Sequence, residues 1–364
     1  MRIIQVLTTI AFGDAVSNDV LAIRDILSQK GFETGIYAEH IDTRLPDGTA
    51  RVVGELPRLD AKDIMIYHAS TGTQLNFDLP KLPGRKMMIY HNITPAEFFE
   101  GYSPDAVRLT TFGYEGMRYL SDKVSCCVAD SDYNRQDLRK LGYTCPIEVC
   151  PIIIPFEDYD REPDRKIIDQ YASDGWTNLL FVGRIAPNKK QEDIIRAFYC
   201  YQRDYNPRSR LFLVGNSGGM EKYESRLTDY VNRLGLKDKV IFPGHIGFDA
   251  ILAYYRLADV FVCMSEHEGF CVPIVEAMHF GIPIVAYSSS AIPETLGKGG
   301  LLLDDKDPYL AAAAIDRLVR DRTLRDYISD RQREKLEEYR YETVRKRLVD
   351  CLDKLLGSQA GEKK

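Results

Sequence analysis

Several features that mark particular classes of protein are missing from this sequence. Its eight cysteines show no paired CxxC spacing, so the pattern gives no zinc site. No apolar run approaches the roughly 18 residues of a membrane span. The net charge is −6, which excludes the cationic footprint of a nucleic-acid-binding protein. No G-x-G-x-x-G follows the first apolar run, which disfavours an NAD(P)-dependent oxidoreductase.

The cysteines and the first residues bear on the compartment. The cysteines lie largely within apolar runs, as expected for reduced, buried thiols of a cytoplasmic protein. They are Cys126, Cys127, Cys145, Cys150, Cys200, Cys263, Cys271 and Cys351. Met1–Ile10 is apolar, but Gly13 and Asp14 follow without a small-residue cleavage site, so this segment predicts a β-strand and not a signal peptide. We expect a cytoplasmic protein, with peripheral contact at the inner face of the membrane and the oligomeric state left open.

What the chain does contain is a regular alternation of strands and helices. Its 364 residues, 45% hydrophobic and 28% charged, suit a soluble globular protein of about two domains. Strands are predicted at Ile3–Leu7, Thr34–Ala38, Asp63–His68, Lys86–His91, Val124–Ala129, Ile147–Cys150, Asn178–Val182, Arg210–Val214, Lys239–Phe242, Asp259–Met264, Pro283–Ala286 and Leu301–Leu303. Amphipathic helices are predicted at Val16–Lys30, Asp132–Leu141, Gln191–Tyr205 and Tyr223–Leu234. This alternation indicates βαβ units and parallel sheets.

Two series of about six strands are too many for one small sheet. The break falls at Pro151–Pro163, where prolines bracket a run of acidic residues, as is typical of a linker. We predict an α/β protein with two doubly wound, Rossmann-like domains, 1–155 and 165–340, facing a central cleft. A helix over 341–356 can pack back on the first domain, and 357–364 are expected to be disordered. Ligands of such sheets bind outside the carboxyl ends of the strands.

The most informative segment is SEHEGFCVPIVEAM, residues 265–278, which directly follows a predicted apolar strand. Pro273 is preorganised for the first turn of a helix, and Gly269 allows a tight turn close to a ligand. The N–H groups at the start of this helix form an anion site. We expect the backbone groups of Phe270, Cys271 and Val272 to contribute to it.

Two carboxylates, Glu268 and Glu276, flank this anion site. Because carboxylates repel phosphates, they are not expected to be phosphate ligands. They accept hydrogen bonds from hydroxyls, which sugars and ribose supply in number. The alternative is that both side chains only cap or solvate the helix. The surrounding glycine, proline and apolar residues favour the binding role.

A second segment, FVGRIAPNKK over residues 181–190, delivers two cations to the end of a strand. Arg184, directly after Gly183, offers a planar fork for phosphate oxygens, and Lys189 offers a compact point charge. Together they can neutralise a departing diphosphate without a divalent metal. We therefore expect neither a metal nor a cofactor. Lys190 is interpreted as an ordinary solvated residue.

The two segments together resemble family 4 of the retaining glycosyltransferases. The matching elements are VGRIAPNK, followed by EGFCVPIVEAM with seven residues between its two glutamates. The resemblance covers residues 178–303 well and the first half more loosely, and it implies the GT-B fold. It also implies that Arg184 and Lys189 hold the donor diphosphate, that Glu268 contacts the sugar hydroxyls and that Glu276 contacts the nucleotide ribose.

Some positions match the family less closely. At Cys271 many members have glycine, so the thiol is expected to narrow the donor pocket. Gly13 resembles a glycine of the loop that touches the donor phosphate. Asp14 stands where a second glycine is common, and it suits an acceptor hydroxyl instead. His91 resembles a family histidine at the donor sugar, and its neighbour Asn92 is expected at the acceptor.

Three further strand ends complete the expected site. Gly215 and Asn216 follow one strand of the second domain and border the nucleotide, as do His245 and Ile246 after the next. Glycine clusters are also common in ordinary turns. In the first domain, we interpret Ala129-Asp130-Ser131 as the cap of the helix that starts at 132.

The sequence thus predicts a metal-independent, retaining hexosyltransferase for polysaccharide or glycoconjugate biosynthesis. Its expected partners are a nucleotide-diphosphate sugar and a carbohydrate or lipid-linked saccharide acceptor, and no nucleic acid. Domain closure would exclude water and align the acceptor. A GT-B sugar phosphorylase, a nucleotide-sugar epimerase and a non-catalytic nucleotide-sugar-binding protein remain as alternatives. The base and sugar of the donor are not specified.

Overall fold

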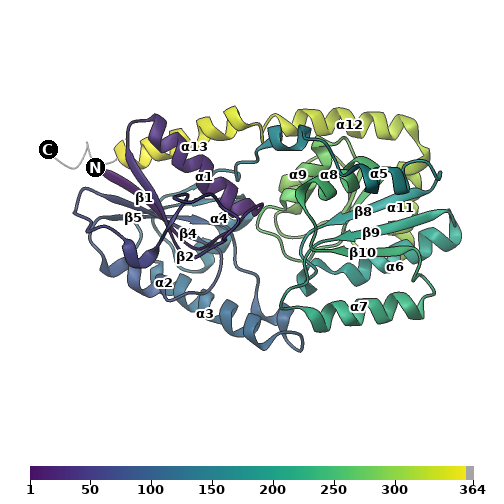
Figure 1. Ribbon diagram of the computed structural model, residues 1–364, viewed down its shortest axis with the longest axis horizontal. Coiled ribbons are helices and arrows are strands. Elements are labelled where there is room, and N and C mark those ends of the chain that lie inside the picture. Colours follow the sequence, from purple (N-terminus) through teal and green to yellow (C-terminus); the bar gives the residue numbers. More distant parts are fainter. Residues whose placement is uncertain (358–364) are drawn as a thin grey trace. The chain divides into compact units, whose positions relative to one another are not determined.

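The computed structural model describes residues 1–357, which form two units with one parallel sheet each (Figure 1). The first unit comprises Met1–Ala96, Val107–Pro155 and the chain from Tyr339 onward. The second comprises Glu97–Ala106 and Phe156–Glu338. Of the predicted disordered tail over 357–364, all but Gly357 lies outside the described residues.

The sheet of the first unit has seven strands in the order β3-β2-β1-β4-β5-β6-β7, which is a doubly wound arrangement. The strands are β1 (Arg2–Ile10), β2 (Glu33–Ile41), β3 (Arg51–Val52), β4 (Ile64–Ala69), β5 (Arg85–Tyr90), β6 (Cys126–Ala129) and β7 (Ile147–Val149). The α-helices are α1 (Ala15–Gln29), α2 (Leu75–Asp78), α3 (Pro104–Leu120), α4 (Asp132–Lys140) and α13 (Tyr341–Gly357). The strand order reverses between β1 and β4, the position at which such sheets bind ligands.

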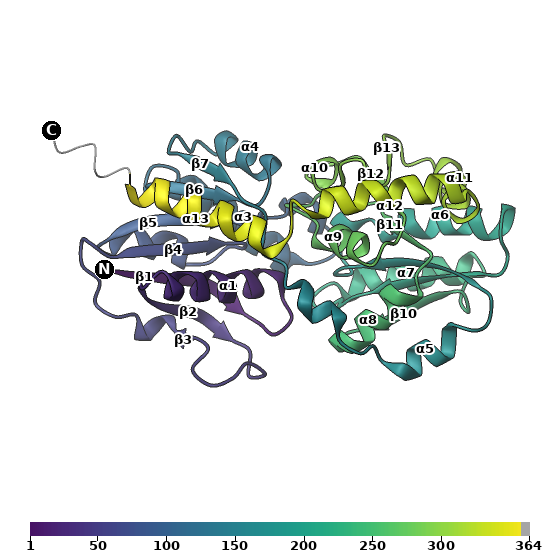
Figure 2. The same ribbon diagram turned by 90° about the horizontal axis from the view of Figure 1, so that it is seen from above.

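Alternate residues along these strands fill two different cores, because successive side chains of a strand point to opposite faces. On one face Ile3 and Ile66 pack against α1 and α13, which lie together on that side of the sheet (Figure 2). Val344 and Leu348 of α13 belong to this core, so the last described helix is part of the first unit.

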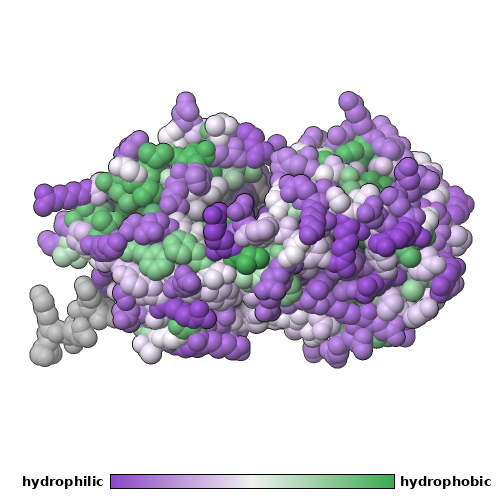
Figure 3. Space-filling view, turned by 90° about the horizontal axis from the view of Figure 1, so that it is seen from below, coloured by the Kyte–Doolittle hydropathy of each residue, from purple (hydrophilic) through white to green (hydrophobic). Residues whose placement is uncertain are grey.

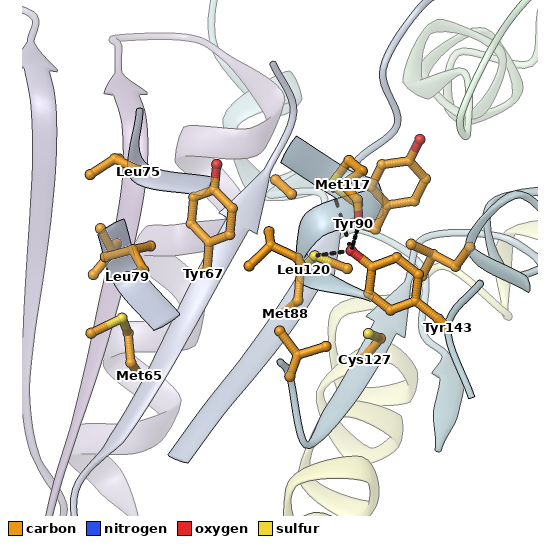
Figure 4. Close-up of a cluster of buried hydrophobic side chains, with 14 of the residues drawn as sticks. Met65, Tyr67, Leu75, Leu79, Met88, Tyr90, Met117, Leu120, Cys127 and Tyr143 are labelled. Carbon is orange, nitrogen blue, oxygen red and sulfur yellow. Dashed lines mark hydrogen bonds between the residues drawn. The ribbon is translucent and has the colours of Figure 1, made fainter. Parts of the chain in front are cut away.

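The opposite face packs against α2 and α3. Met65, Met88 and Tyr143 meet residues of both helices in the buried cluster of Figure 4. The Tyr143 hydroxyl donates a hydrogen bond of 2.8 Å to the carbonyl oxygen of Met117, so its polar atom has a partner. With both faces covered by helices, the sheet leaves mainly its strand ends for function.

Helix α3 was not among the predicted helices, and it contains two residues that are unfavourable inside a helix, Gly113 and Gly116. The structure gives the reason for these glycines. A Cβ on Gly116 would lie 2.1 Å from the side-chain nitrogen of Asn76. A Cβ on Gly72 would lie 2.0 Å from the carbonyl oxygen of Leu109 in the same helix. The small residues therefore allow α3 to approach the segment after β4 closely.

The second unit repeats the doubly wound order as β10-β9-β8-β11-β12-β13. Its strands are β8 (Thr177–Val182), β9 (Ser209–Val214), β10 (Val240–Gly244), β11 (Val260–Cys263), β12 (Ile284–Tyr287) and β13 (Leu301–Leu303). Its α-helices are α5 (Arg165–Tyr171), α6 (Gln191–Asp204), α7 (Glu221–Arg233), α8 (Phe248–Leu257), α9 (Val272–His279), α10 (Ile292–Leu296), α11 (Pro308–Arg320) and α12 (Arg322–Leu336).

The division of the chain differs from the predicted boundaries in two places, of which the shorter is 339–340, predicted in the second domain but grouped with the first unit. Residues 97–106 fall in the sequence range predicted for the first domain, but they group with the second unit. Tyr102 of this segment packs edge-on against Tyr223 of α7, with ring centroids 5.2 Å apart, and its hydroxyl contacts Arg226. A contact between residues so far apart in the sequence leaves no local signal. Among the described residues, no helix combines the length and apolar character needed to cross a bilayer.

Candidate active site

The strand order of the second unit reverses between β8 and β11, and the two predicted motifs follow these strands. Asn188 joins the two loops. Its side-chain amide donates a hydrogen bond of 3.1 Å to the carbonyl oxygen of His267, and its own carbonyl accepts one of 2.8 Å from the N–H of Glu266. Asn188 is buried, so these bonds are shielded from water. The structure thus brings together two segments that lie about 80 residues apart.

An ion pair lies where the two loops meet. The ammonium of Lys189 is 2.6 Å from Oε2 of Glu268, and the two side chains are 20% and 9% exposed. Burial disfavours the charged ammonium, but the carboxylate of Glu268 outweighs this effect and raises the pKa of Lys189. Lys189 is therefore a cation at neutral pH. Two of its three N–H donors remain for a ligand.

Arg184 lies beside this pair along the carboxyl edge of the sheet. Its guanidinium donates one hydrogen bond of 2.9 Å, to the carbonyl oxygen of Gly218 in the loop after β9. The backbone N–H of Ile185 donates a bond of 2.9 Å to the carbonyl of Asn216 in the same loop. The residue as a whole is exposed, and a guanidinium has five N–H donors, so this one bond leaves donors for a ligand.

The close approach of these loops depends on Gly215. A Cβ at this position would lie 1.9 Å from the carbonyl oxygen of Gly183, far inside contact distance. Both glycines have positive φ, 159° and 152°. They were expected to border the nucleotide, and the structure adds that the loops could not meet with a larger residue at 215.

Helix α9 starts at Val272, with Pro273 in its first turn as predicted. Its N-cap is Cys271, which adopts a left-handed conformation with φ of 75°. Phe270 is buried, and its carbonyl accepts a hydrogen bond of 2.5 Å from the hydroxyl of Thr295. The first N–H groups of a helix lack partners within it, so this end can bind an anion. Gly269 lies in the loop immediately before it.

Glu276 is held on α9 by two tyrosines. Its Oε1 accepts a hydrogen bond of 2.5 Å from Tyr159, and its Oε2 accepts one of 2.5 Å from Tyr255. Burial raises the pKa of Glu276, and the two hydroxyls act against this shift. A carboxylate has about four lone-pair positions, so two remain for hydroxyls of a ligand. His245 and Ile246 follow β10 at the same edge of the sheet, and His245 is exposed.

In the first unit, His91 is part of a linear series of hydrogen bonds that runs from Asp130 to Gln5. Its Nδ1 lies 2.9 Å from a carboxylate oxygen of Asp130, and its Nε2 lies 3.0 Å from Nδ1 of His68. His68 Nε2 in turn lies 3.0 Å from the side-chain oxygen of Gln5. Both ring nitrogens of His91 are engaged inside the unit. Its predicted contact with a donor sugar stays a prediction and requires one of these bonds to open.

The orientation of Gln5 determines where the protons lie. Its amide nitrogen donates a bond of 3.0 Å to the carbonyl of Val20, so its oxygen faces His68. His68 must then donate from Nε2 and accept at Nδ1, and His91 must donate from both nitrogens. Burial lowers the pKa of His91, but Asp130 reverses this effect and the net shift is upward. His91 is thus a buried imidazolium paired with a carboxylate.

A second carboxylate, Asp19, lies beside this series of hydrogen bonds. Its Oδ1 accepts a hydrogen bond of 2.9 Å from the backbone N–H of Ile153. Burial raises the pKa of Asp19 to about 7, against the influence of the charge on His91. Asp19, Asp130 and His68 share no pattern in the sequence that would predict this group, although His68 interrupts an apolar strand.

The remaining predicted residues of the first unit have structural partners. Asp14 is the N-cap of α1, and its Oδ2 accepts hydrogen bonds of 2.9 Å from both the N–H and the hydroxyl of Ser17. Asn92 has φ of 79°, and its amide donates a bond of 2.8 Å to Asn134. Gly13 has φ of 75° and open space around it. The interpretation of 129–131 as a cap is confirmed, since Ser131 accepts a hydrogen bond from the N–H of Asn134.

Two clusters of metal-ligating residue types form in the described chain, although neither has a recognisable spacing in the sequence. One consists of Asp19, His68 and His91, whose ring nitrogens already have the partners given above. The other consists of Cys263, Glu268 and Cys271. In each cluster one ligand atom per residue lies within 4.8 Å of the others.

Comparison with known proteins finds similarity to glycosyltransferases, most of all in the second unit. Residues 164–335 match the model of glycosyl transferases group 1. An uncharacterized glycosyltransferase of Methanocaldococcus jannaschii is 31% identical over 245 residues, which cover 64% of this chain and 61% of that protein. A GDP-mannose-dependent alpha-(1-6)-phosphatidylinositol monomannoside mannosyltransferase of Mycobacterium tuberculosis is 27% identical over 252 residues, 65% and 63% of the two chains. The matched regions thus span under two thirds of these relatives.

Solved structures match over nearly the whole chain. HepE of Anabaena in complex with UDP-glucose has a TM-score of 0.76 at 20% identity, covering 97% of this chain and 100% of that one. Sucrose-phosphate synthase of Thermosynechococcus elongatus has a TM-score of 0.75 at 16% identity, covering 98% and 100%. At such identities the likeness shows the fold. The chain has the GT-B fold, and its residues 164–335 match the glycosyl transferases group 1 model, in line with the resemblance to family 4.

Proposed function

We propose that this chain is a retaining glycosyltransferase that moves a sugar from a nucleotide-diphosphate sugar to a hydroxyl acceptor. One observation carries the proposal: Arg184, the Lys189–Glu268 pair and the start of α9 are all joined at the reversal point of the second sheet. This is where doubly wound sheets bind nucleotides. The relatives named as glycosyltransferases and the neighbour solved with UDP-glucose support the same ligand class.

The diphosphate of the donor binds to two cations and a helix end. Arg184 retains most of its five N–H donors, and Lys189 retains two of three. The N–H groups at the start of α9 add a further positive end. As the bond between sugar and phosphate breaks, negative charge grows on the leaving diphosphate, and fixed donors stabilise it without reorganising. No metal ion is required by this arrangement.

The two glutamates bind hydroxyls. Glu268 is already charged against Lys189 and accepts hydroxyls of the transferred sugar, while Glu276 accepts the hydroxyls of the ribose. Two tyrosines fix both oxygens of Glu276 and leave one lone pair on each. Because the carboxylate is held before the nucleotide arrives, little side-chain entropy is lost on binding.

We propose that retention, which the resemblance to family 4 implies, proceeds without a covalent intermediate, because the described residues of the site include no obvious nucleophile. Glu268 is paired with Lys189, and Glu276 is clamped by two hydroxyls, so neither is placed to form a covalent glycosyl intermediate. The acceptor hydroxyl then attacks the sugar on the face that the leaving group departs from. Its proton passes to the departing phosphate oxygen, which becomes the base as the bond to the sugar breaks.

The acceptor is a saccharide, and a lipid-linked form suits the surface of the first unit. A groove of about 760 Å³ there is lined mainly by apolar residues. They include Val53, Leu56, Leu59, Leu75, Leu79 and Leu82. On the face seen in Figure 3, apolar residues also gather in larger patches over this unit than over the second. The named substrate of the mycobacterial relative is itself a glycolipid.

The proposal is tested first by donor binding. A thermal-shift panel of UDP-, GDP- and ADP-sugars should contain at least one donor that stabilises the protein, since a ligand of the native state raises its melting temperature. Release of nucleotide diphosphate is then followed with free and lipid-linked saccharides, and the anomeric configuration of the product is read by NMR. An inverted product would exclude the retaining mechanism.

Arg184→Ala provides the matched test of the site. The exposed guanidinium makes one contact with the protein, so the variant should fold normally and lose at least about 100-fold in turnover. Arg322→Ala, at the exposed start of α12, serves as the control for loss of one positive charge. Equal turnover in the two variants would remove the diphosphate role from Arg184.

A further inference from the structure

Two thiols and a carboxylate lie close together next to the start of α9, the anion site of the second unit. Cys263 ends β11, and Cys271 precedes α9. Their sulfur atoms and a carboxylate oxygen of Glu268 all lie within 4.8 Å of one another. The residues are 1%, 7% and 8% exposed. The cluster is therefore a small, buried set of donor atoms. Lys189, whose side chain is 20% exposed, contacts it through Glu268.

The backbone at Cys271 is in a conformation that a cysteine does not prefer. Its φ of 75° lies in the left-handed region, which is unfavourable for a residue that carries a Cβ. Glycine would adopt this conformation readily. In this conformation the sulfur of Cys271 lies within 4.8 Å of ligand atoms of Cys263 and Glu268, so the side chain completes the cluster.

The donor atoms suit a thiophilic divalent metal. Two thiolates and one carboxylate are typical ligands of Zn²⁺, with bond lengths of about 2.3 Å to sulfur and 2.0–2.2 Å to oxygen. Tetrahedral bonds of that length place ligand atoms about 3.8 Å apart. The present separations, all within 4.8 Å, exceed this spacing by no more than about 1 Å.

The charges of an occupied cluster also balance. On binding, each thiol releases its proton to the solvent, so two thiolates and the carboxylate carry three negative charges against two on the metal. The ammonium of Lys189, 2.6 Å from the carboxylate of Glu268, cancels the remaining charge. A buried group of charges with no net charge avoids most of the cost of an isolated buried ion.

We propose that Cys263, Glu268 and Cys271 form a site for a thiophilic divalent metal of the Zn²⁺ class, and that metal and donor sugar exclude each other. Water fills the fourth position of the metal. The first half of this proposal rests on the cluster alone. The second half rests on the proposed function, because a metal on Glu268 would occupy the place at this carboxylate that the proposed function assigns to the sugar hydroxyls. The metal would act as an inhibitor of transfer.

The site itself is tested with Cd²⁺, whose bonds to thiolates give a charge-transfer absorption. The full-length protein should take up one tight equivalent with this absorption, and Cys263→Ser should lose it. Glu268→Gln keeps both thiols and should bind at least 10-fold more weakly. Cys145→Ser is the control, since Cys145 lies in the other close thiol pair, 3.7 Å from Cys127. Far-ultraviolet circular dichroism verifies that each variant is folded.

An unchanged first equivalent in Cys263→Ser, or its loss in Cys145→Ser alone, would overturn the site. Exclusion is tested by titrating Cd²⁺ with and without a saturating nucleotide sugar, which should weaken metal binding at least 10-fold. An equal metal affinity in both titrations would overturn the exclusion while the site stands. If no nucleotide sugar binds the metal-free protein, the proposed function fails and the absorption result still decides the metal site.

Discussion

The two units share one strand order but treat the polar residues at their strand ends differently. In the second unit, Arg184, Lys189 and Glu276 each have partners and still keep unused hydrogen-bonding capacity. In the first, His91 and Asn92 direct their side chains to other residues of the same unit. Residues that satisfy one another stabilise a fold, whereas residues with donors and acceptors left over can bind a ligand. The same architecture thus leaves hydrogen-bonding groups for a ligand at the strand ends of the second unit, whereas in the first unit these groups bond to one another.

The largest expected effect compares a glycine from each unit. Gly215→Ala should destabilise the protein by more than about 4 kcal/mol, because its Cβ would meet the carbonyl oxygen of Gly183 at 1.9 Å. Gly13→Ala has open space around its Cβ and should cost only the left-handed strain, roughly 1–2 kcal/mol. Urea unfolding of both variants measures the difference. Similar losses would mean that the loops of the second unit do not need their close approach.

Next in size is the buried ion pair of the first unit. Asp130→Asn leaves the imidazolium of His91 without its counter-charge, and should cost about 3–5 kcal/mol, as for other broken buried pairs. It should also shift the ring nitrogen resonances of His91 toward the neutral form. Asp122→Asn removes one carboxylate of an exposed pair and should change stability by less than about 1 kcal/mol. A neutral His91 in the unmodified protein would refute the proton arrangement.

The pH dependence of stability sharpens the same contrast. Asp19 keeps its proton in the folded state up to a pKa of about 7, while the unfolded chain loses it near 3.8. The free energy of unfolding should therefore fall as pH rises through this window, by about 4 kcal/mol. His91, with its raised pKa, adds a fall that continues above pH 6.5.

Asp19→Asn should remove the decrease in the free energy of unfolding below pH 6.5. The decrease that comes from deprotonation of His91 should remain. The amide oxygen can still accept from the N–H of Ile153, so the contact is kept. Unfolding curves of the two proteins at a series of pH values provide the measurement. Parallel pH profiles would show that Asp19 does not titrate in this window.

The smallest effect concerns the tyrosine clamp of the second unit. Tyr255→Phe removes one of two hydrogen bonds to Glu276 and should raise the KM for the donor several-fold while kcat changes little. Tyr171→Phe, at the end of α5 and away from Glu276, is the control. A fall in kcat without a change in KM would place Tyr255 in the chemical step instead of in ribose binding.

Much of this architecture could be predicted from local patterns. The alternation of apolar runs and amphipathic helices located twelve of the thirteen strands and missed only β3, which has two residues. The motifs around Arg184 and Glu268 were recognisable because a strand, a glycine turn and a helix start all lie within a few residues. The signal was weaker for α3, whose glycines serve contacts outside the helix.

The sequence by itself determined the two doubly wound sheets and the segments that carry the charges, because strand and helix periodicity and turn residues are local properties. The tertiary structure alone decided which residues meet. It pairs Lys189 with Glu268 and places Cys263 beside Cys271. It also brings His91 within hydrogen-bond distance of Asp130 and His68. These contacts arise where parallel strands end at a common edge of a sheet. The residues that meet there have no fixed separation along the sequence, so no sequence pattern predicts them.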